Sequence, residues 1–264
     1  MSVAQSLKAQ RPEVREALAS YLLAVADDEL ILGHRHSEWT GLAPDIESDV
    51  ALSSVAQEEI GHARLFYERA TELLGGSPDL LAYGRDSGAF RNAVLVERPN
   101  GDWAFTIVRM FLYDQADAVR LDALAGGQLA VVADLARAIR REEKYHLLYG
   151  EQWLRRLSAA TPQSRDHVQA ALDEAWPLAQ GLFEPVEGAQ ALVPEVMGMP
   201  VEAQQERWRS QVTAVLAAAG LRLPAGGAAQ KAPPAGRRGS HTDDLRALLE
   251  EMTAVRRADP EATW

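Results

Sequence analysis

Cysteine is absent from all 264 residues of this chain. Its absence excludes disulfides, thiolate zinc sites and cysteine-bound iron–sulfur clusters. A reducing compartment is the natural setting for such a chain, so we expect a cytoplasmic protein. An excess of positive charge is also missing, because the formal net charge is −11 at pH 7. Nucleic-acid phosphates require a basic surface, and therefore no nucleic-acid partner is expected.

Long apolar runs and a leader sequence are missing as well. No stretch reaches the roughly 20 apolar residues of a membrane-spanning helix. The N-terminus lacks the basic region, apolar run and cleavage site of a signal peptide. We therefore expect neither a membrane segment nor a cleaved leader. The residues that are present, 47% hydrophobic and 25% charged, are typical of a globular protein with a substantial core.

Helical periodicity dominates the chain, and glycine and proline mark the breaks between helices. Residues 76–101 are rich in Gly, Pro, Asn and Asp, which predicts the long connection that ferritin-like folds use. Residues 224–239 are rich in Pro, Gly and Ala and are predicted to be a linker. The predicted helices cover about 12–37, 44–75, 102–125, 128–157, 163–181, 201–219 and 242–257.

The predicted architecture is a single all-α domain over residues 1–264. Its core is a ferritin-like four-helix bundle within residues 12–157, and the additional C-terminal helices follow it. Basic residues of the linker, among them Lys231 and Arg237, and the final helix are candidate parts of a docking surface for a partner protein.

Two of the long helices contain the same motif, Glu-x-x-His. One copy is Glu59 with His62, and the other is Glu143 with His146. Residues three apart lie on one face of a helix, so the carboxylate and the imidazole can bind one ion or two adjacent ions. Each copy lies in an apolar stripe that faces the core, where a carboxylate is costly unless a cation neutralises it. The repeated motif therefore predicts a buried metal site.

Bundles that hold two metal ions take Glu-x-x-His from two helices and one carboxylate from each of the other two. Glu29 and Asp114 lie in the core-facing stripes of the first and third helices, whereas Asp28 and Asp117 lie beside those stripes. Oxygen and imidazole donors without sulfur suit Fe(II), Mn(II) or Zn(II). The sequence predicts a dinuclear site, with iron as the first choice and manganese as the alternative, formed by Glu29, Glu59, His62, Asp114, Glu143 and His146.

A buried polar network without metal is the alternative interpretation. Cationic side chains would then neutralise the carboxylates, and Arg64, Arg109 and Arg140 are the candidates. Glu58 and Glu142, which precede the predicted ligand carboxylates, are expected at the surface or in ion pairs, or at most in contact with a ligand without binding metal themselves.

Four further residues are interpreted as structural. Tyr113 and Tyr145 are expected to pack as core aromatics, although they neighbour ligand candidates. His36 is expected to cap the first long helix, and His241 to be exposed to solvent.

Four segments together resemble one known protein family. They cover residues 37–44, 96–101, 144–146 and the tail from 239 to 264. Their sequences include Ser-Glu-Trp-Thr-Gly, Val-Glu-Arg-Pro-Asn-Gly, Lys-Tyr-His and Gly-Ser-His-Thr. From about residue 26 to its end, the chain is similar to the ferritin-like C subunit of the bacterial ring-1,2-phenylacetyl-CoA epoxidase, a multicomponent monooxygenase of phenylacetate catabolism.

The resemblance implies a protein that works in a complex. Complexes of this family epoxidise the ring of phenylacetyl-CoA with O2, and NADPH supplies electrons through a flavin and iron–sulfur reductase. The family's A subunit holds the catalytic di-iron site and the CoA thioester, and the C subunit pairs with it as a structural partner. We therefore expect a hetero-oligomer with the epoxidase A subunit, a small bridging subunit and the external reductase, with no flavin or iron–sulfur cluster in this chain.

The chain departs from the family at the metal ligands. Typical C subunits have lost several of these ligands, whereas this sequence retains both Glu-x-x-His motifs and both supporting acids. Two alternatives to a partner subunit therefore stay open: a di-iron oxygenase in its own right, and a ferritin-like iron-storage or peroxide-detoxifying protein. The C-terminal third and the epoxidase-like tail favour the partner subunit, because a minimal storage bundle needs neither.

Overall fold

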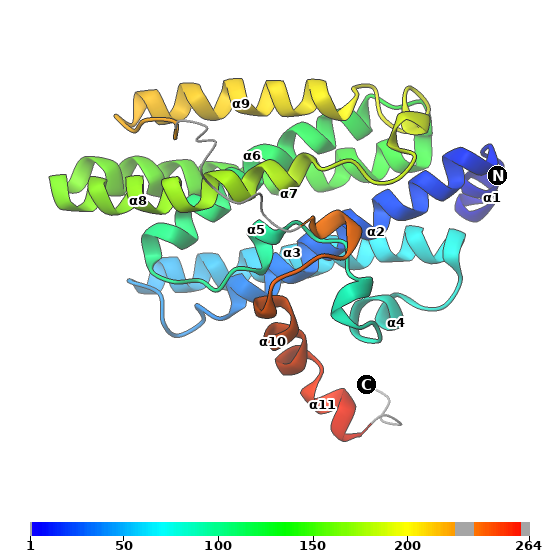
Figure 1. Cartoon of the computed structure of the whole chain (residues 1–264), viewed down its shortest axis with the longest axis horizontal. Helices are drawn as coiled ribbons and strands as arrows, with labels where there is room; N and C mark the ends of the chain where they lie inside the picture. Colours follow the sequence, from blue (N-terminus) through cyan, green and yellow to red (C-terminus); the bar gives the residue numbers. More distant parts are fainter. Residues whose placement is uncertain (1, 225–234, 260–264) are drawn as a thin grey trace.

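The computed structural model describes residues 2–224 and 235–259 (Figure 1). The regular structure in these ranges is helical, and no strand occurs in them. The all-α prediction is therefore confirmed, and the four predicted bundle helices match the observed ones to within a few residues. These helices are α2 (Pro12–Ser37), α3 (Ile46–Leu74), α6 (Trp103–Ala125) and α7 (Ala130–Ala160).

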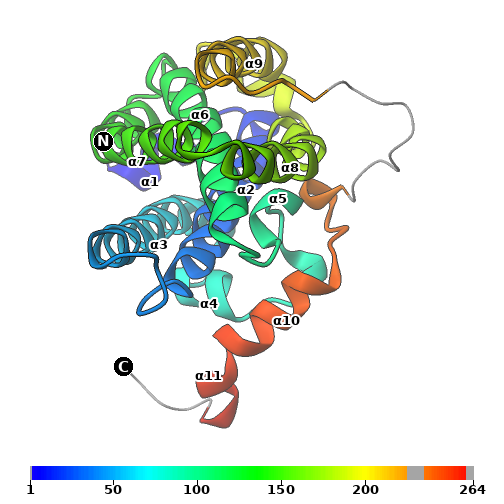
Figure 2. The same cartoon turned by 90° about the vertical axis from the view of Figure 1, so that its left-hand side faces the viewer.

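The four long helices form two antiparallel hairpins that pack against each other. Helices α2 and α3 form one hairpin, and α6 and α7 form the other (Figures 1 and 2). Residues 104–121 of α6 are all buried, so this helix is enclosed on every side. Helices α3 and α7 keep one exposed face each. Polar side chains on α6 must therefore find partners inside the protein.

Local sequence signals set the helix ends. The side chain of Asp45 accepts a hydrogen bond from the amide of Ser48 (2.8 Å) and so caps α3. Asp102 caps α6 in the same way through the amide of Phe105 (2.9 Å). Helix α7 begins two residues later than predicted, because the amides at 128 and 129 donate to the carbonyl of Glu195 instead.

The predicted long connection between the hairpins contains short helical pieces. They are α4 (Pro78–Tyr83), the 3-10 turn η1 (Ser87–Ala89) and α5 (Val94–Glu97). The connection is tied to α2 because the amide of Arg91 donates to Asp27 Oδ2 (2.7 Å), and the amide of Ala93 donates to Asp28 Oδ1 (2.8 Å).

The predicted C-terminal helices cover α6. They are α8 (Pro162–Ala179) and α9 (Val201–Ala218), separated by the 3-10 turns η2 (Gln180–Phe183) and η3 (Ala189–Leu192). Trp176 of α8 and Trp208 of α9 stack with their ring centroids 4.9 Å apart. This contact belongs to an apolar cluster between α6, α8 and α9.

The C-terminal segment passes α5 at the edge of the molecule (Figure 2), and α10 (Asp243–Met252) contacts α5 and η1. Lys231 and Trp264, and most of the predicted linker 224–239, lie outside the described residues. The end of that linker differs from the prediction, because Arg237 is buried in a packed 3-10 turn. The predicted final helix is interrupted at Thr253. The segment consists of η4 (Gly236–Arg238), α10 and α11 (Ala254–Ala258).

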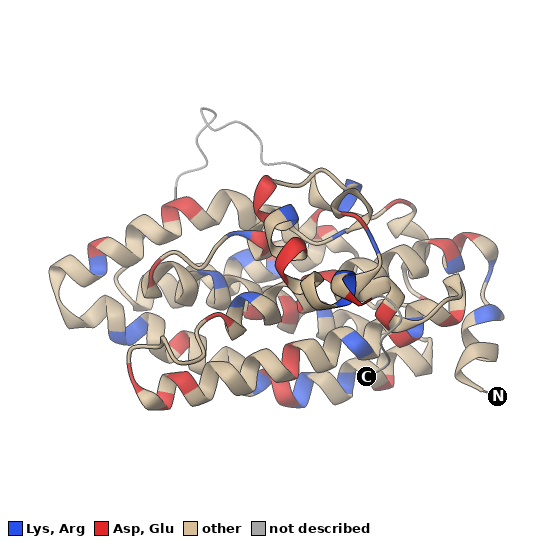
Figure 3. Cartoon of the chain, turned by 90° about the horizontal axis from the view of Figure 1, so that it is seen from below, with Lys and Arg blue, Asp and Glu red and all other residues tan. Residues whose placement is uncertain are grey.

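Charges of both signs are mixed on the surface of the bundle. Acidic and basic residues are interspersed along the helices of the face shown in Figure 3. Mixed charge of this kind differs from the clustered basic surface that phosphates require. Over the ranges that the structure describes, no helix is long and apolar enough to cross a membrane.

Candidate metal centre

The two Glu-x-x-His motifs meet at the contact between α3 and α7, with α2 beside them. Glu29, Glu59, His62 and Glu143 each offer one donor atom, and these atoms all lie within 4.8 Å of one another. These four residues are at most 2% exposed. Three of the four bundle helices thus bring predicted ligands together in the core.

Glu143 lies between the two imidazoles. Its Oε1 is 3.1 Å from His62 Nδ1 and 3.2 Å from His146 Nδ1. Glu29 Oε2 is 3.8 Å from His62 Nδ1, and Glu59 Oε1 is 3.5 Å from His146 Nδ1. The two rings have centroids 6.3 Å apart. Glu143 therefore has the position of a carboxylate that can serve two neighbouring ions.

His146 and Asp114 lie outside the group of four converging donors. His146 nevertheless contacts two members of the group, as the distances above show. Asp114 is 1% exposed and faces α7 at Gly150, where an added Cβ would lie 3.4 Å from Asp114 Oδ2. Gly150 is one helical turn beyond His146, so Asp114 lies at the His146 end of the centre.

The donor atoms have the environment of metal ligands. Within the described ranges, Glu29 Oε2, both histidine Nδ1 atoms and both carboxylate oxygens of Glu59, Asp114 and Glu143 are buried without a hydrogen-bond partner. Buried polar atoms normally have a partner. The short contacts between imidazole Nδ1 atoms and carboxylate oxygens do not have hydrogen-bond geometry. These atoms all point into a common space. This donor set fits a divalent metal such as iron or manganese.

Each imidazole is held from its outer side by the opposite helix. His62 Nε2 lies 2.8 Å from Glu142 Oε2, and His146 Nε2 lies 2.7 Å from Glu58 Oε2. Metal-binding histidines commonly donate their second N–H to a carboxylate, which fixes the ring and its tautomer. Glu58 and Glu142 are 44% and 59% exposed, in agreement with the predicted surface ion pairs.

The centre concentrates negative charge. Burial lowers the pKa of His62, but the close carboxylates of Glu143 and Glu29 outweigh burial and raise this pKa to about 12. Glu143 and Glu59 raise the pKa of His146 in the same way. Burial and then the charge of Glu29 raise the pKa of Glu59 well above its usual range. Protons and metal ions therefore compete for the same donors.

Arg120 contacts the candidate ligands, and this contact was not predicted from the sequence. It lies on α6, where its guanidinium donates to Glu29 Oε1 (2.9 Å) and to Asp28 Oδ2 (3.1 Å) and pairs with Asp117. An arginine therefore does pair with Glu29, as in the alternative interpretation of a buried polar network. It is Arg120, however, and none of the three arginines that were predicted. In the described part of the chain, no ligand carboxylate forms an ion pair with Arg64, Arg109 or Arg140.

Of the four structural interpretations, the core packing of Tyr113 is confirmed and the other three were wrong, because side-chain direction decides them. Tyr113 packs in the core as predicted, and its hydroxyl also donates to Glu29 Oε1 (2.8 Å), a contact that was not predicted. Tyr145 is 70% exposed on the outer face of α7. The side chain of His241 is only 4% exposed, with Nδ1 2.7 Å from Glu97 Oε2. His36 is fully buried. None of these directions follows from residue type alone.

Comparison with known proteins agrees with the resemblance noted in the sequence. Residues 1–264 match the family described as Phenylacetic acid catabolic protein. The chain is 36% identical over 251 residues to a protein of Escherichia coli (strain K12) that is named as the C subunit of 1,2-phenylacetyl-CoA epoxidase. That match covers 94% of this chain and 99% of its relative. The chain therefore belongs to the Phenylacetic acid catabolic protein family, and it is similar over nearly its full length to an epoxidase C subunit.

Proposed function

We propose that this chain is the C-type subunit of a phenylacetyl-CoA epoxidase and that it carries a dinuclear metal site. Full-length similarity to a protein named as the C subunit of that enzyme supports the assignment to phenylacetate catabolism. The proposed partners are the catalytic A-type subunit and a small bridging subunit, with an external flavin and iron–sulfur reductase. Epoxidation would use O2, NADPH and phenylacetyl-CoA, and a cytoplasmic location is part of the proposal.

One observation carries the metal proposal: four buried donor atoms from three helices lie within 4.8 Å of one another. Iron is the proposed metal, with manganese as the alternative. The six predicted ligands would hold the two ions, with Glu143 between them. Glu58 and Glu142 orient the two imidazoles, and Arg120 orients Glu29. Bound iron would supply the redox chemistry that protein side chains lack.

Exposed apolar side chains support a partner protein. Ile46 and Val50 of α3 are 74% and 63% exposed, and Leu42, just before α3, is 71% exposed. Tyr145 and Leu148 of α7 are 70% and 43% exposed. Large exposed apolar groups are typical of interaction surfaces. We propose that the A-type partner covers this α3–α7 side of the bundle.

A di-iron oxygenase in its own right is the second candidate. The observation that favours it is the pair of contacts that fix both imidazoles, because a relic site does not need oriented ligands. Iron storage gains no comparable support.

The test is reconstitution with purified components. This chain, with its A-type partner, bridging subunit and reductase, is assayed for NADPH- and O2-dependent turnover of phenylacetyl-CoA, and then assayed again without the A-type partner. A stable complex and turnover only when that partner is present are the expected results. Turnover in its absence would favour the second candidate, and failure to bind it would contradict the proposal.

A further inference from the structure

Three consecutive acids at the middle of α2 are fully buried and face different parts of the molecule. Asp27 accepts a hydrogen bond from the hydroxyl of Tyr67 (2.6 Å) and pairs with Arg85. Glu29 faces the candidate metal centre. Asp28, between them, faces the C-terminal segment. Successive side chains on a helix point about 100° apart. On α2, the residue that contacts the C-terminal segment is therefore adjacent to the residue that faces the candidate metal centre.

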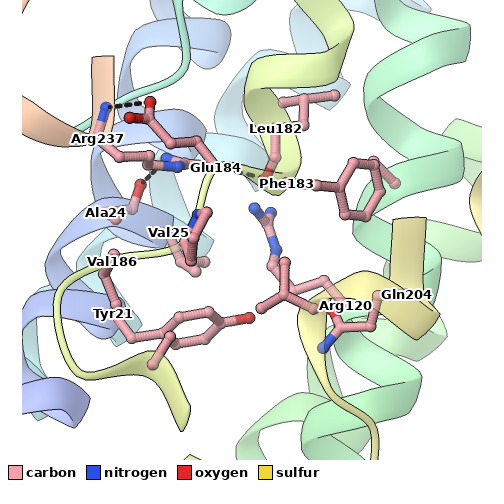
Figure 4. A pocket seen from close by; sticks show the side chains of 14 residues that line it. Tyr21, Ala24, Val25, Arg120, Leu182, Phe183, Glu184, Val186, Gln204 and Arg237 are labelled. Carbon is pink, nitrogen blue, oxygen red and sulfur yellow. Dashed lines mark hydrogen bonds between the residues drawn. The ribbon is translucent and has the colours of Figure 1, made fainter. Parts of the chain in front are cut away.

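Arg237 of the C-terminal segment binds Asp28 with both arms of its guanidinium. The two N–O distances are 2.8 Å to Oδ1 and 2.6 Å to Oδ2. The same guanidinium donates to the carbonyls of Ala24 (3.1 Å) and Arg91 (2.9 Å). The side chain is 4% exposed. Figure 4 shows Arg237 on one side of a pocket that Arg120 also lines.

The backbone around Arg237 is shaped for this position. A Cβ at Gly236 would overlap the carbonyl oxygen of Asn92. Gly239 has φ +77°, and a Cβ there would overlap the carbonyl oxygen of Gly88. Further along, the amide of Thr242 donates to the buried carboxylate of Glu97 (2.7 Å). Glycine occurs at both positions where this backbone approaches a carbonyl oxygen, and the hydrogen bond to Glu97 is a second buried contact. These features indicate that residues 235–242 dock in one specific conformation.

Asp28 connects Arg237 to the metal centre. Its Oδ2 accepts hydrogen bonds from Arg237 and from Arg120, and Arg120 in turn donates to Glu29 Oε1 (2.9 Å). Arg120 also pairs with Asp117. Without Arg237, the Arg120 guanidinium would be the cation that Asp28, Glu29 and Asp117 share. Attraction to an uncompensated Asp28 would then draw Arg120 away from Glu29.

We propose that Arg237 is a positioning residue of the candidate metal centre. When it neutralises Asp28, Arg120 holds Glu29 Oε1, and Glu29 Oε2 points toward His62. This inference rests on the proposed metal site. Because linkage between two binding events is reciprocal, metal binding and docking of residues 235–242 should strengthen each other by the same factor.

The experiment measures Mn(II) and anaerobic Fe(II) affinity of the full chain and of Arg237→Gln. Loss of a residue that orients a ligand typically weakens metal binding about 10-fold to 100-fold, and we expect a loss in this range. Arg238→Gln is the matched control, because Arg238 is 74% exposed and pairs with Glu184 at the surface. Its affinity should stay within about twofold of wild type. The double variant Asp28→Asn, Arg237→Gln should regain most of the lost affinity, because it removes the unpaired charge.

Hydrogen exchange on the wild-type chain gives a second readout that does not depend on the variants folding. Metal should slow exchange of the amides in residues 236–242. Equal metal affinity in wild type and Arg237→Gln, or no recovery in the double variant, would overturn this inference alone. No change in exchange on metal binding would do the same. If the wild-type chain binds no metal, both this inference and the proposed metal site are overturned.

Discussion

Glu58 on α3 lies 2.7 Å from His146 on α7, measured from Oε2 to Nε2. The contact between Glu142 and His62 repeats this relationship in the opposite sense at 2.8 Å. Each motif, together with the glutamate just before it, therefore makes contacts in two directions. Its own glutamate and histidine face the candidate metal centre, and the preceding glutamate contacts the histidine of the other motif. This reciprocity requires both helices to be in register, so the centre forms only when the bundle is assembled.

Replacing either outer carboxylate should weaken metal binding without preventing folding. Glu142→Gln leaves His62 with a neutral acceptor, and Glu58→Gln does the same to His146. Each change should lower Mn(II) affinity by about 10-fold or more, as measured by titration calorimetry. Asp134→Asn on α7 is the control, because this carboxylate is 73% exposed and pairs with Arg137. An equal effect of the control would show that surface charge, and not imidazole orientation, controls affinity.

Metal binding should strengthen as the pH rises. Neighbouring carboxylates outweigh burial and raise the pKa of His62 to about 12, and they raise that of His146 as well. At neutral pH each imidazole must therefore lose a proton before it can bind metal. We expect affinity to rise about 10-fold per pH unit for each displaced proton between about pH 6 and about pH 8, with proton release detectable in dilute buffer. A pH-independent affinity would contradict this assignment of the donors.

Replacement of two glycines near the centre by alanine should change the free energy of unfolding in opposite directions. A Cβ at Gly33 would lie 2.9 Å from Ile60 Cγ1 and 3.1 Å from the carbonyl oxygen of Ala56, so Gly33→Ala must push α2 away from α3. We expect the free energy of unfolding to fall by about 1–3 kcal/mol in urea denaturation.

Gly61→Ala is the matched control on α3. Gly61 is exposed, and among the described residues an added Cβ would have no neighbour within 4 Å. Alanine should raise the free energy of unfolding by about 1 kcal/mol, because glycine is a poor helix former. Stabilisation by both substitutions would show that α2 and α3 do not approach as closely as described.

The sequence predicted the bundle because its signals are local and repeated. Pro12 and Asp45 mark the starts of α2 and α3, and Gly75 marks the end of α3. The spacing of three residues within each Glu-x-x-His motif placed both carboxylates and both imidazoles on core-facing stripes. Glu29 was chosen over Asp28 by the same periodicity, and the structure places Glu29 beside His62.

The contacts around the candidate ligands were not predictable, because they join distant parts of the chain. Arg120 reaches Glu29 across 91 residues of sequence, and Arg237 reaches Asp28 across 209 residues. The composition around Arg237 indicated a linker, and composition cannot show that one arginine of a linker is buried. Tyr113 packs in the core as predicted, but the hydrogen bond of its hydroxyl to Glu29 was not predictable, since periodicity gives no direction on a helix that is buried on all sides.

The most direct test of the account is the metal content of the purified chain after anaerobic Fe(II) loading, compared with a Glu59→Ala, Glu143→Ala double variant. A dinuclear centre should give about two iron ions per wild-type chain and their loss in the variant, with both proteins folded by circular dichroism. A wild-type chain that takes up no stoichiometric metal, or a folded variant that retains it, would contradict the dinuclear centre.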